Sequence, residues 1–154
     1  MNKSSKMFNL LSSIDKLDQA IVCWMRDHGV RYLRYSLGIV FIWFGLLKPF
    51  HLSPAQELVT QTVYWFNPEL FIPFLGWWEV LIGICLLYKP LIRLGILLMA
   101  LQMVGTFMPI VLLPEVVFNG KFYALTLTGQ YIVKNIVLIA AAMVVGSHVR
   151  EKKC

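Results

Sequence analysis

The stretch RYSLGIVFIWFGLLKPF, from Arg34 to Phe50, is a run of apolar and aromatic residues that closes with a lysine and a proline. A helix needs about 20 mainly apolar residues to cross the hydrocarbon core of a bilayer, and this run nearly meets that requirement. Lys48 near its end has two interpretations. It is either an anchor that reaches up to the membrane surface, or one wall of a polar site inside a membrane protein.

Similar apolar runs recur along the chain of 154 residues, of which 58% are hydrophobic and 14% are charged. Soluble domains carry about 25% charged residues, so the composition indicates an integral membrane protein. The net charge of +6 then favours anionic lipid headgroups, and not nucleic acid, as the partner of the basic residues. The predicted fold is an all-α membrane bundle of four helices, with spans over about 32–50, 71–88, 91–113 and 125–146.

Two shorter helices are predicted outside the bilayer core. In MFNLLSSIDKLDQAIVCWM, residues 7–25, apolar residues recur at helical spacing and charged residues occupy the other side, which predicts an amphipathic helix on the cytoplasmic membrane surface. On the outer side, SPAQELVTQTVYWF offers Ser53 as N-cap, Pro54 at the first helical position and Gln56 three residues after the cap. This is a capping-box pattern, and it predicts a short helix.

Basic residues predict the orientation of the chain. They gather before the first span, around the short connection YKPLIR and after the last span, whereas the other two connections carry only Lys121. Because cytoplasmic loops are rich in Lys and Arg, both termini are expected in the cytoplasm. The short connection makes the second and third spans an antiparallel hairpin. The expected parts are a cytoplasmic amphipathic segment 1–30, a four-span domain 31–148 and a cytoplasmic basic tail 149–154.

Polar residues inside the spans are the candidate site residues, since a charge at the bilayer centre costs about 2.5–3.5 kcal/mol on insertion scales. All of them are expected in the outer half of the membrane, around a polar cavity that faces outward. They are Lys48, Glu79, Gln102, Thr106, Lys134 and Asn135. Glu79 and Lys134 are the expected ion pair. The structural alternatives stay open: an ion pair that fixes helix register, and polar side chains that only join helices.

Other signals are weaker. Trp43 and Trp78 are secondary candidates, for which packing and interfacial anchoring compete with contact to a cofactor. Tyr131 lies beside Asn135 on the last span and is a further secondary candidate. The sequence shows no metal-ligand cluster, no phosphate-binding loop and no C-x-x-C motif, so no metal is expected.

Four segments in order resemble the DoxX-like superfamily, and most closely its YkgB-like branch. The first span closes in the pattern W-x-G-x-x-K, and GWWEVLIGICLL resembles the G-x-x-E motif of the second span. LPEVVF and LTGQYIVKNIVLIAAA resemble the segments that follow. The resemblance implies a four-helix protein of the bacterial inner membrane, with motif positions at Lys48, Glu79, Glu115, Lys134 and Asn135. DoxX-like proteins include a subunit of a thiosulfate:quinone oxidoreductase, proteins tied to oxidative-stress resistance and receptor-assembly chaperones.

Three hypotheses follow for the function. The leading one is a cavity that binds a small hydrophobic or redox-active molecule such as a quinone, with Glu79 and Lys134 as its floor and Lys48 and Gln102 as its walls. The second is a non-catalytic scaffold or chaperone for a partner protein, which would use the amphipathic N-terminal helix. The third is a small-solute channel, which would require a homo-oligomer. Whether the protein is an enzyme stays open.

Overall fold

The computed structural model describes the backbone of residues 3–150 and the side chains of residues 14–149. Most of the predicted tail, residues 151–154, therefore lies outside the described residues. The described part is helical, with one isolated bridge between Phe118 and Leu125 as its only β-type pairing. Its elements are α1 (Lys3–Leu47), α2 (Gln56–Thr62), α3 (Pro68–Leu87), η1 (Lys89–Leu91), α4 (Ile92–Leu112), α5 (Pro114–Val117), α6 (Leu127–Ser147) and η2 (His148–Arg150).

Four of the described helices, α1, α3, α4 and α6, are long and apolar enough to cross a membrane by length and composition. This confirms the prediction of an all-α fold with four long apolar helices. The hairpin of α3 and α4, joined through η1, is also confirmed. Many large apolar side chains face outward, as expected where lipid and not water is the solvent.

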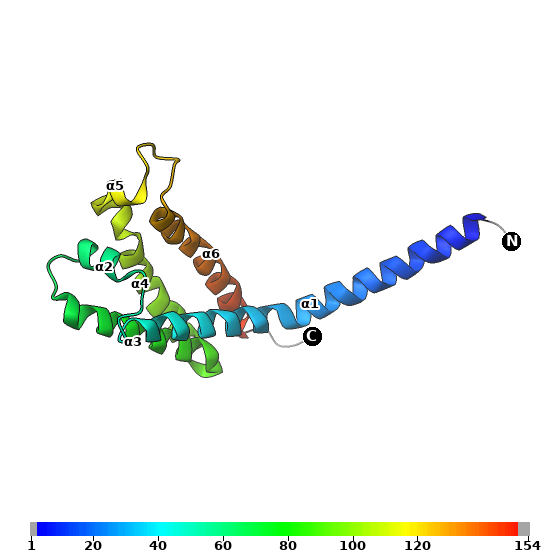
Figure 1. The fold of residues 1–154 in the computed structure, drawn as a ribbon. Helices are drawn as coiled ribbons and strands as arrows, with labels where there is room; N and C mark the ends of the chain where they lie inside the picture. The colour runs from blue at the N-terminus through cyan, green and yellow to red at the C-terminus, as the bar shows by residue number, and fades with distance from the viewer. Residues whose placement is uncertain (1–2, 151–154) are drawn as a thin grey trace.

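The bundle places each long helix beside two others. α3 packs against α1 and α4, and α6 packs against the same two helices (Figure 1). Within the described residues α3 and α6 barely touch, so they lie diagonally opposite each other. The buried core between the helices is apolar, with Leu37, Phe41, Ile82, Leu86, Met99 and Val145 among its members.

The N-terminal amphipathic segment is helical as predicted, but it runs into the first span without a break. Figure 1 shows the N-terminal half of α1 extending away from the other helices. Contacts one turn apart bridge the expected boundary: the rings of Trp24 and His28 stack at 5.1 Å, and Arg31 donates a hydrogen bond to the carbonyl of Asp27. Gly29 costs only about 1 kcal/mol relative to alanine in a helix. The position near residue 30 is therefore not a helix boundary.

The short helix α2 is present, but its predicted capping box does not form. The helix begins at Gln56, two residues later than Pro54. The Ser53 hydroxyl accepts a long hydrogen bond of 3.4 Å from the amide of Ala55. The Gln56 amide pairs with His51 at 3.0 Å instead of reaching back to Ser53.

Candidate functional site

Three polar side chains from three parts of the bundle meet in one buried cluster. Lys48, directly after α1, forms an ion pair with the Oε2 atom of Glu79 on α3. Gln102 on α4 donates a hydrogen bond from Nε2 to the Oε1 atom of Glu79, at 2.5 Å. Lys48 and Glu79 are only 6% and 9% exposed. We refer to Lys48, Glu79 and Gln102 as the polar cluster.

The way α1 ends explains why Lys48 is buried. Lys48 continues the stripe of Phe41 and Gly45, which are both buried against the bundle. Beyond it, the amide of Leu52 donates to the carbonyl of Leu47 at 2.9 Å, and the amide of His51 donates to the carbonyl of Lys48 at 3.1 Å. His51 has a φ of 57°, in the left-handed region. This pattern is a Schellman C-cap, and it keeps Lys48 in the last helical turn, facing inward.

Glycines bring the backbones of α1 and α3 close enough for the ion pair. A Cβ atom on Gly45 would lie 2.7 Å from the carbonyl oxygen of Gly76, and a Cβ atom on Gly83 would lie 2.5 Å from that of Gly38. No side chain fits at such distances. The Cβ atom of Glu79 lies 2.9 Å from the position of a Cβ on Gly45. Lys48 and Glu79 therefore flank the glycine contact and meet across it.

The amide of Gln102 has a fixed orientation in the cluster. An ionised carboxylate can only accept hydrogen bonds, so the nitrogen of Gln102 must face Glu79. Its Oε1 atom is buried, and no donor among the described residues lies within hydrogen-bond reach of it. Thr106, one turn along α4, donates to the backbone carbonyl of Gln102 at 3.2 Å and does not satisfy this oxygen. The polar cluster therefore contains one buried hydrogen-bond acceptor, the Oε1 atom of Gln102, that has no donor among the described residues.

The predicted ion pair between Glu79 and Lys134 is wrong. Lys134 is exposed, and its ammonium lies 5.2 Å from the centre of the Tyr131 ring. The physical reason is the arrangement of the helices, since α6 lies diagonally across the bundle from α3. Asn135 also stays apart from the cluster, because its amide donates to the backbone carbonyls of Tyr131 and Ile132 on its own helix.

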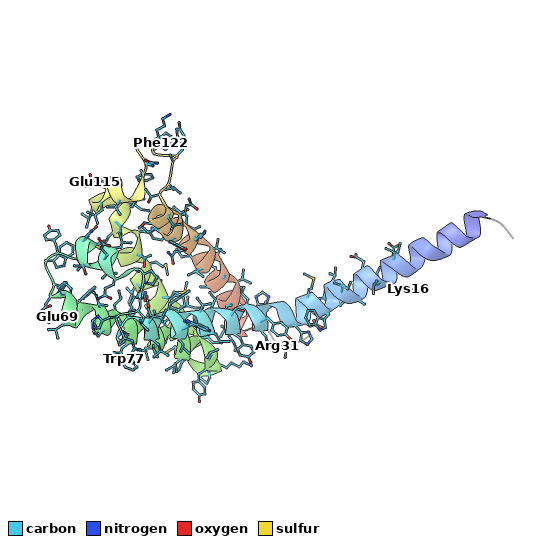
Figure 2. All side chains as sticks on the ribbon, in the orientation of Figure 1. Lys16, Arg31, Glu69, Trp77, Glu115 and Phe122 are labelled. Atoms are coloured by element: carbon cyan, nitrogen blue, oxygen red, sulfur yellow. The ribbon has the colours of Figure 1, made fainter. Side chains whose placement is uncertain are left out.

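The remaining candidates lie away from the polar cluster or serve packing. Trp43 is 65% exposed on α1. Trp78 is half-buried against the apolar core, with its ring 6.2 Å from that of Phe74. Glu115 is exposed on α5, far from the α1–α3 contact in Figure 2. Among the side chains that the structure describes, no group of His, Cys, Asp or Glu is placed to hold a metal ion.

An apolar groove runs along α1. It is lined by Ile39, Ile42, Trp43, Leu46 and Leu47, and no residue of the polar cluster lines it. The cluster can donate hydrogen bonds from its ammonium, accept one at Gln102 and exchange a proton within the Lys48–Glu79 pair.

Comparison with known proteins gives no relative from which a function could be taken. No family model, no curated protein and no solved structure matches this chain. The chemistry of the polar cluster is therefore the basis for assigning a function.

Proposed function

We propose that this chain is a multi-pass DoxX-like protein of the bacterial inner membrane whose polar cluster binds the head of a small hydrophobic, redox-active molecule, such as a quinone and its quinol. The observation that carries the proposal is the buried Oε1 atom of Gln102. A buried acceptor without a partner costs about 1–3 kcal/mol, so a ligand hydroxyl that donates to it would bind favourably. A quinol has such a hydroxyl.

The other members of the cluster suit the same ligand. The ammonium of Lys48 is a donor for a quinone carbonyl, and Glu79 can take up a proton when the ligand loses one. A hydrocarbon tail would meet apolar surface on the outside of the bundle, where large apolar side chains are exposed. Sites of this kind combine an apolar lining with a few polar groups that fix orientation.

The proposed orientation puts both termini in the cytoplasm. Its support is the distribution of Lys and Arg, which gather before the first span, around the hairpin of α3 and α4 and after α6. In this orientation the polar cluster belongs to the outer half of the membrane, because Lys48 follows the end of α1 that is remote from the N-terminus.

The test is mass spectrometry of small molecules that co-purify with the protein in native lipid. The unaltered protein should carry an enriched quinone or quinol, and Gln102→Leu should lose it, because leucine keeps the volume but has no acceptor. Lys134→Met is the matched control, since this lysine lies outside the cluster. Size-exclusion profiles establish that each variant is folded. If folded Gln102→Leu keeps the full amount of ligand, the proposal is wrong.

A further inference from the structure

An apolar stripe on the N-terminal half of α1 lies outside the bundle. Its members are 49% to 63% exposed, and no other described helix covers them: Ile14, Leu17, Ile21 and Trp24. Figure 2 places Lys16 on this projecting half and Arg31 where α1 joins the other helices. A stripe of this size on a projecting helix requires a partner surface.

The spacing of the stripe identifies the kind of partner. The four residues alternate by three and four positions, which is the heptad pattern of positions a and d in a coiled coil. In the sequence, Met7 and Leu10 extend the same register backward and His28 extends it forward. Arg31 occupies the next d position and ends the stripe where α1 enters the bundle. The pattern thus spans three heptads, all within the projecting half.

The charges beside the stripe favour protein over lipid. Helices that lie on membranes carry many Lys and Arg residues on their polar face. Here the charged residues between Ile14 and His28 are three acidic and two basic ones: Asp15, Lys16, Asp18, Arg26 and Asp27. Such a face has no net attraction for anionic headgroups. In addition, α1 is one unbroken helix from this segment into the bundle.

We propose that the N-terminal half of α1 forms a two-stranded parallel coiled coil with the same segment of a second copy of this chain. Copies in one membrane share one orientation, so their helices meet in parallel, each a and d position beside its counterpart. Ile14 and Ile21 at a with Leu17 at d match the combination that favours two strands, whereas Trp24 at d departs from it.

The flanking positions 13, 18, 20 and 25 do not oppose this pairing. In a parallel pair, position g of one helix faces position e of the next heptad in the other, and the register brings Ser13 beside Asp18, and Ala20 beside Met25. Neither pairing sets like charges against each other. The coiled coil is independent of the proposed ligand site, because none of its residues belongs to the polar cluster.

Cysteine cross-linking in native membranes tests the coiled coil on the full-length chain. In a background with Cys23→Ser and Cys154→Ser, a cysteine at Leu17→Cys should form a disulfide-linked dimer when an oxidant is added. The matched control is Gln19→Cys, two residues away at the outward position f, which should stay monomeric. Equal cross-linking of the two variants, or none of either, would overturn the proposal.

A second measurement uses substitutions that remove the interface and leave the four-helix bundle unchanged. Ile14→Asp with Ile21→Asp should convert the dimer to monomer in native-lipid discs, as counted by single-molecule photobleaching, whereas Gln19→Asp should not. Both changes lie outside the four-helix bundle. If the unaltered protein is monomeric, the stripe binds either lipid or a different protein. If lipid without any other protein protects Leu17→Cys from a water-soluble maleimide, the stripe binds lipid. Binding to lipid and binding to a different protein would each reject the coiled coil.

Discussion

Lys48 forms an ion pair with Glu79 and is only 6% exposed, so its side chain is turned into the bundle. A buried pair is weak evidence for stability, because both charges lose their solvation. Removing one partner is nevertheless costly, since the other charge is then buried alone. The ion pair and the Oε1 atom of Gln102, which has no donor among the described residues, place polar groups inside the bundle. Packing of the helices does not by itself require these groups.

Lys48→Met should lower the free energy of unfolding by about 3–5 kcal/mol, because Glu79 is left without its partner. Thermal unfolding of the purified protein in lipid measures the effect. Lys134→Met is the same substitution at an exposed position and should change stability by no more than about 0.5 kcal/mol. The double variant Lys48→Met with Glu79→Met should recover most of the loss. Equal effects of the two single changes would contradict the assignment of the pair.

His51 holds the left-handed position of the cap after α1, at a φ of 57°. A residue with a side chain pays about 1–2 kcal/mol for this conformation, and glycine does not. His51→Gly should therefore be more stable than His51→Ala by about 1 kcal/mol. Comparing these two variants removes the contribution of the hydrogen bond to Gln56, which both lack. Denaturant unfolding measures the difference, and an equal stability would show that the cap is not strained.

At the scale of the helices, apolar length predicted all four long helices, because backbone groups in lipid must be bonded within a helix. The start of α1 could not be predicted in the same way. Its amphipathic and apolar halves differ in composition, but no proline or strong breaker separates them, so the helix continues. The α1–α3 contact had a readable signal, since Gly38 and Gly45 repeat at the same interval as Gly76 and Gly83. These equal intervals identify a contact only when α1 and α3 are already known to be neighbours, and the sequence does not show which helices are neighbours.

Gly45→Ala should lower the free energy of unfolding by about 1–3 kcal/mol, because the new methyl group has no room at the backbone of α3. The same substitution at Gly105 meets nothing within 4 Å and should leave stability unchanged or raise it by up to about 1 kcal/mol. Unfolding in matched lipid compares the two. A loss at Gly105 that equals the loss at Gly45 would mean that the glycine contact does not set the distance between α1 and α3.

At the scale of the whole molecule, the depth of each polar residue could be estimated from sequence, but its neighbours could not. Glu79 and Lys134 both belong to the membrane-spanning part, yet α3 and α6 are diagonal in the bundle. Four apolar helices can be arranged in several cyclic orders with similar burial, and apolar periodicity alone does not choose among them. The choice depends on close contacts such as the glycine contact and on the short connection η1, which fixes α4 beside α3.

The orientation of the whole molecule can be tested by labelling. Phe122 lies in the exposed turn between α5 and α6, which Figure 2 shows at the far end of the bundle from Arg31. With Cys23 and Cys154 replaced by serine, Phe122→Cys should react with an impermeant maleimide in intact cells. In a second protein, in which only Cys154 is replaced by serine, Cys23 is exposed on α1 and should react only after the membrane is opened. The reverse result would place the termini outside.

The unbroken length of α1 has a structural consequence. A helix of 45 residues is about 68 Å long, roughly twice the thickness of the hydrocarbon core. Its N-terminal half projects outside the bundle, and Lys48 directly follows its C-terminal end. The projecting part and the residue before Lys48 therefore belong to one continuous series of backbone hydrogen bonds. One helix thus joins the surface proposed for the coiled coil to the end of the bundle that holds the Lys48–Glu79 pair.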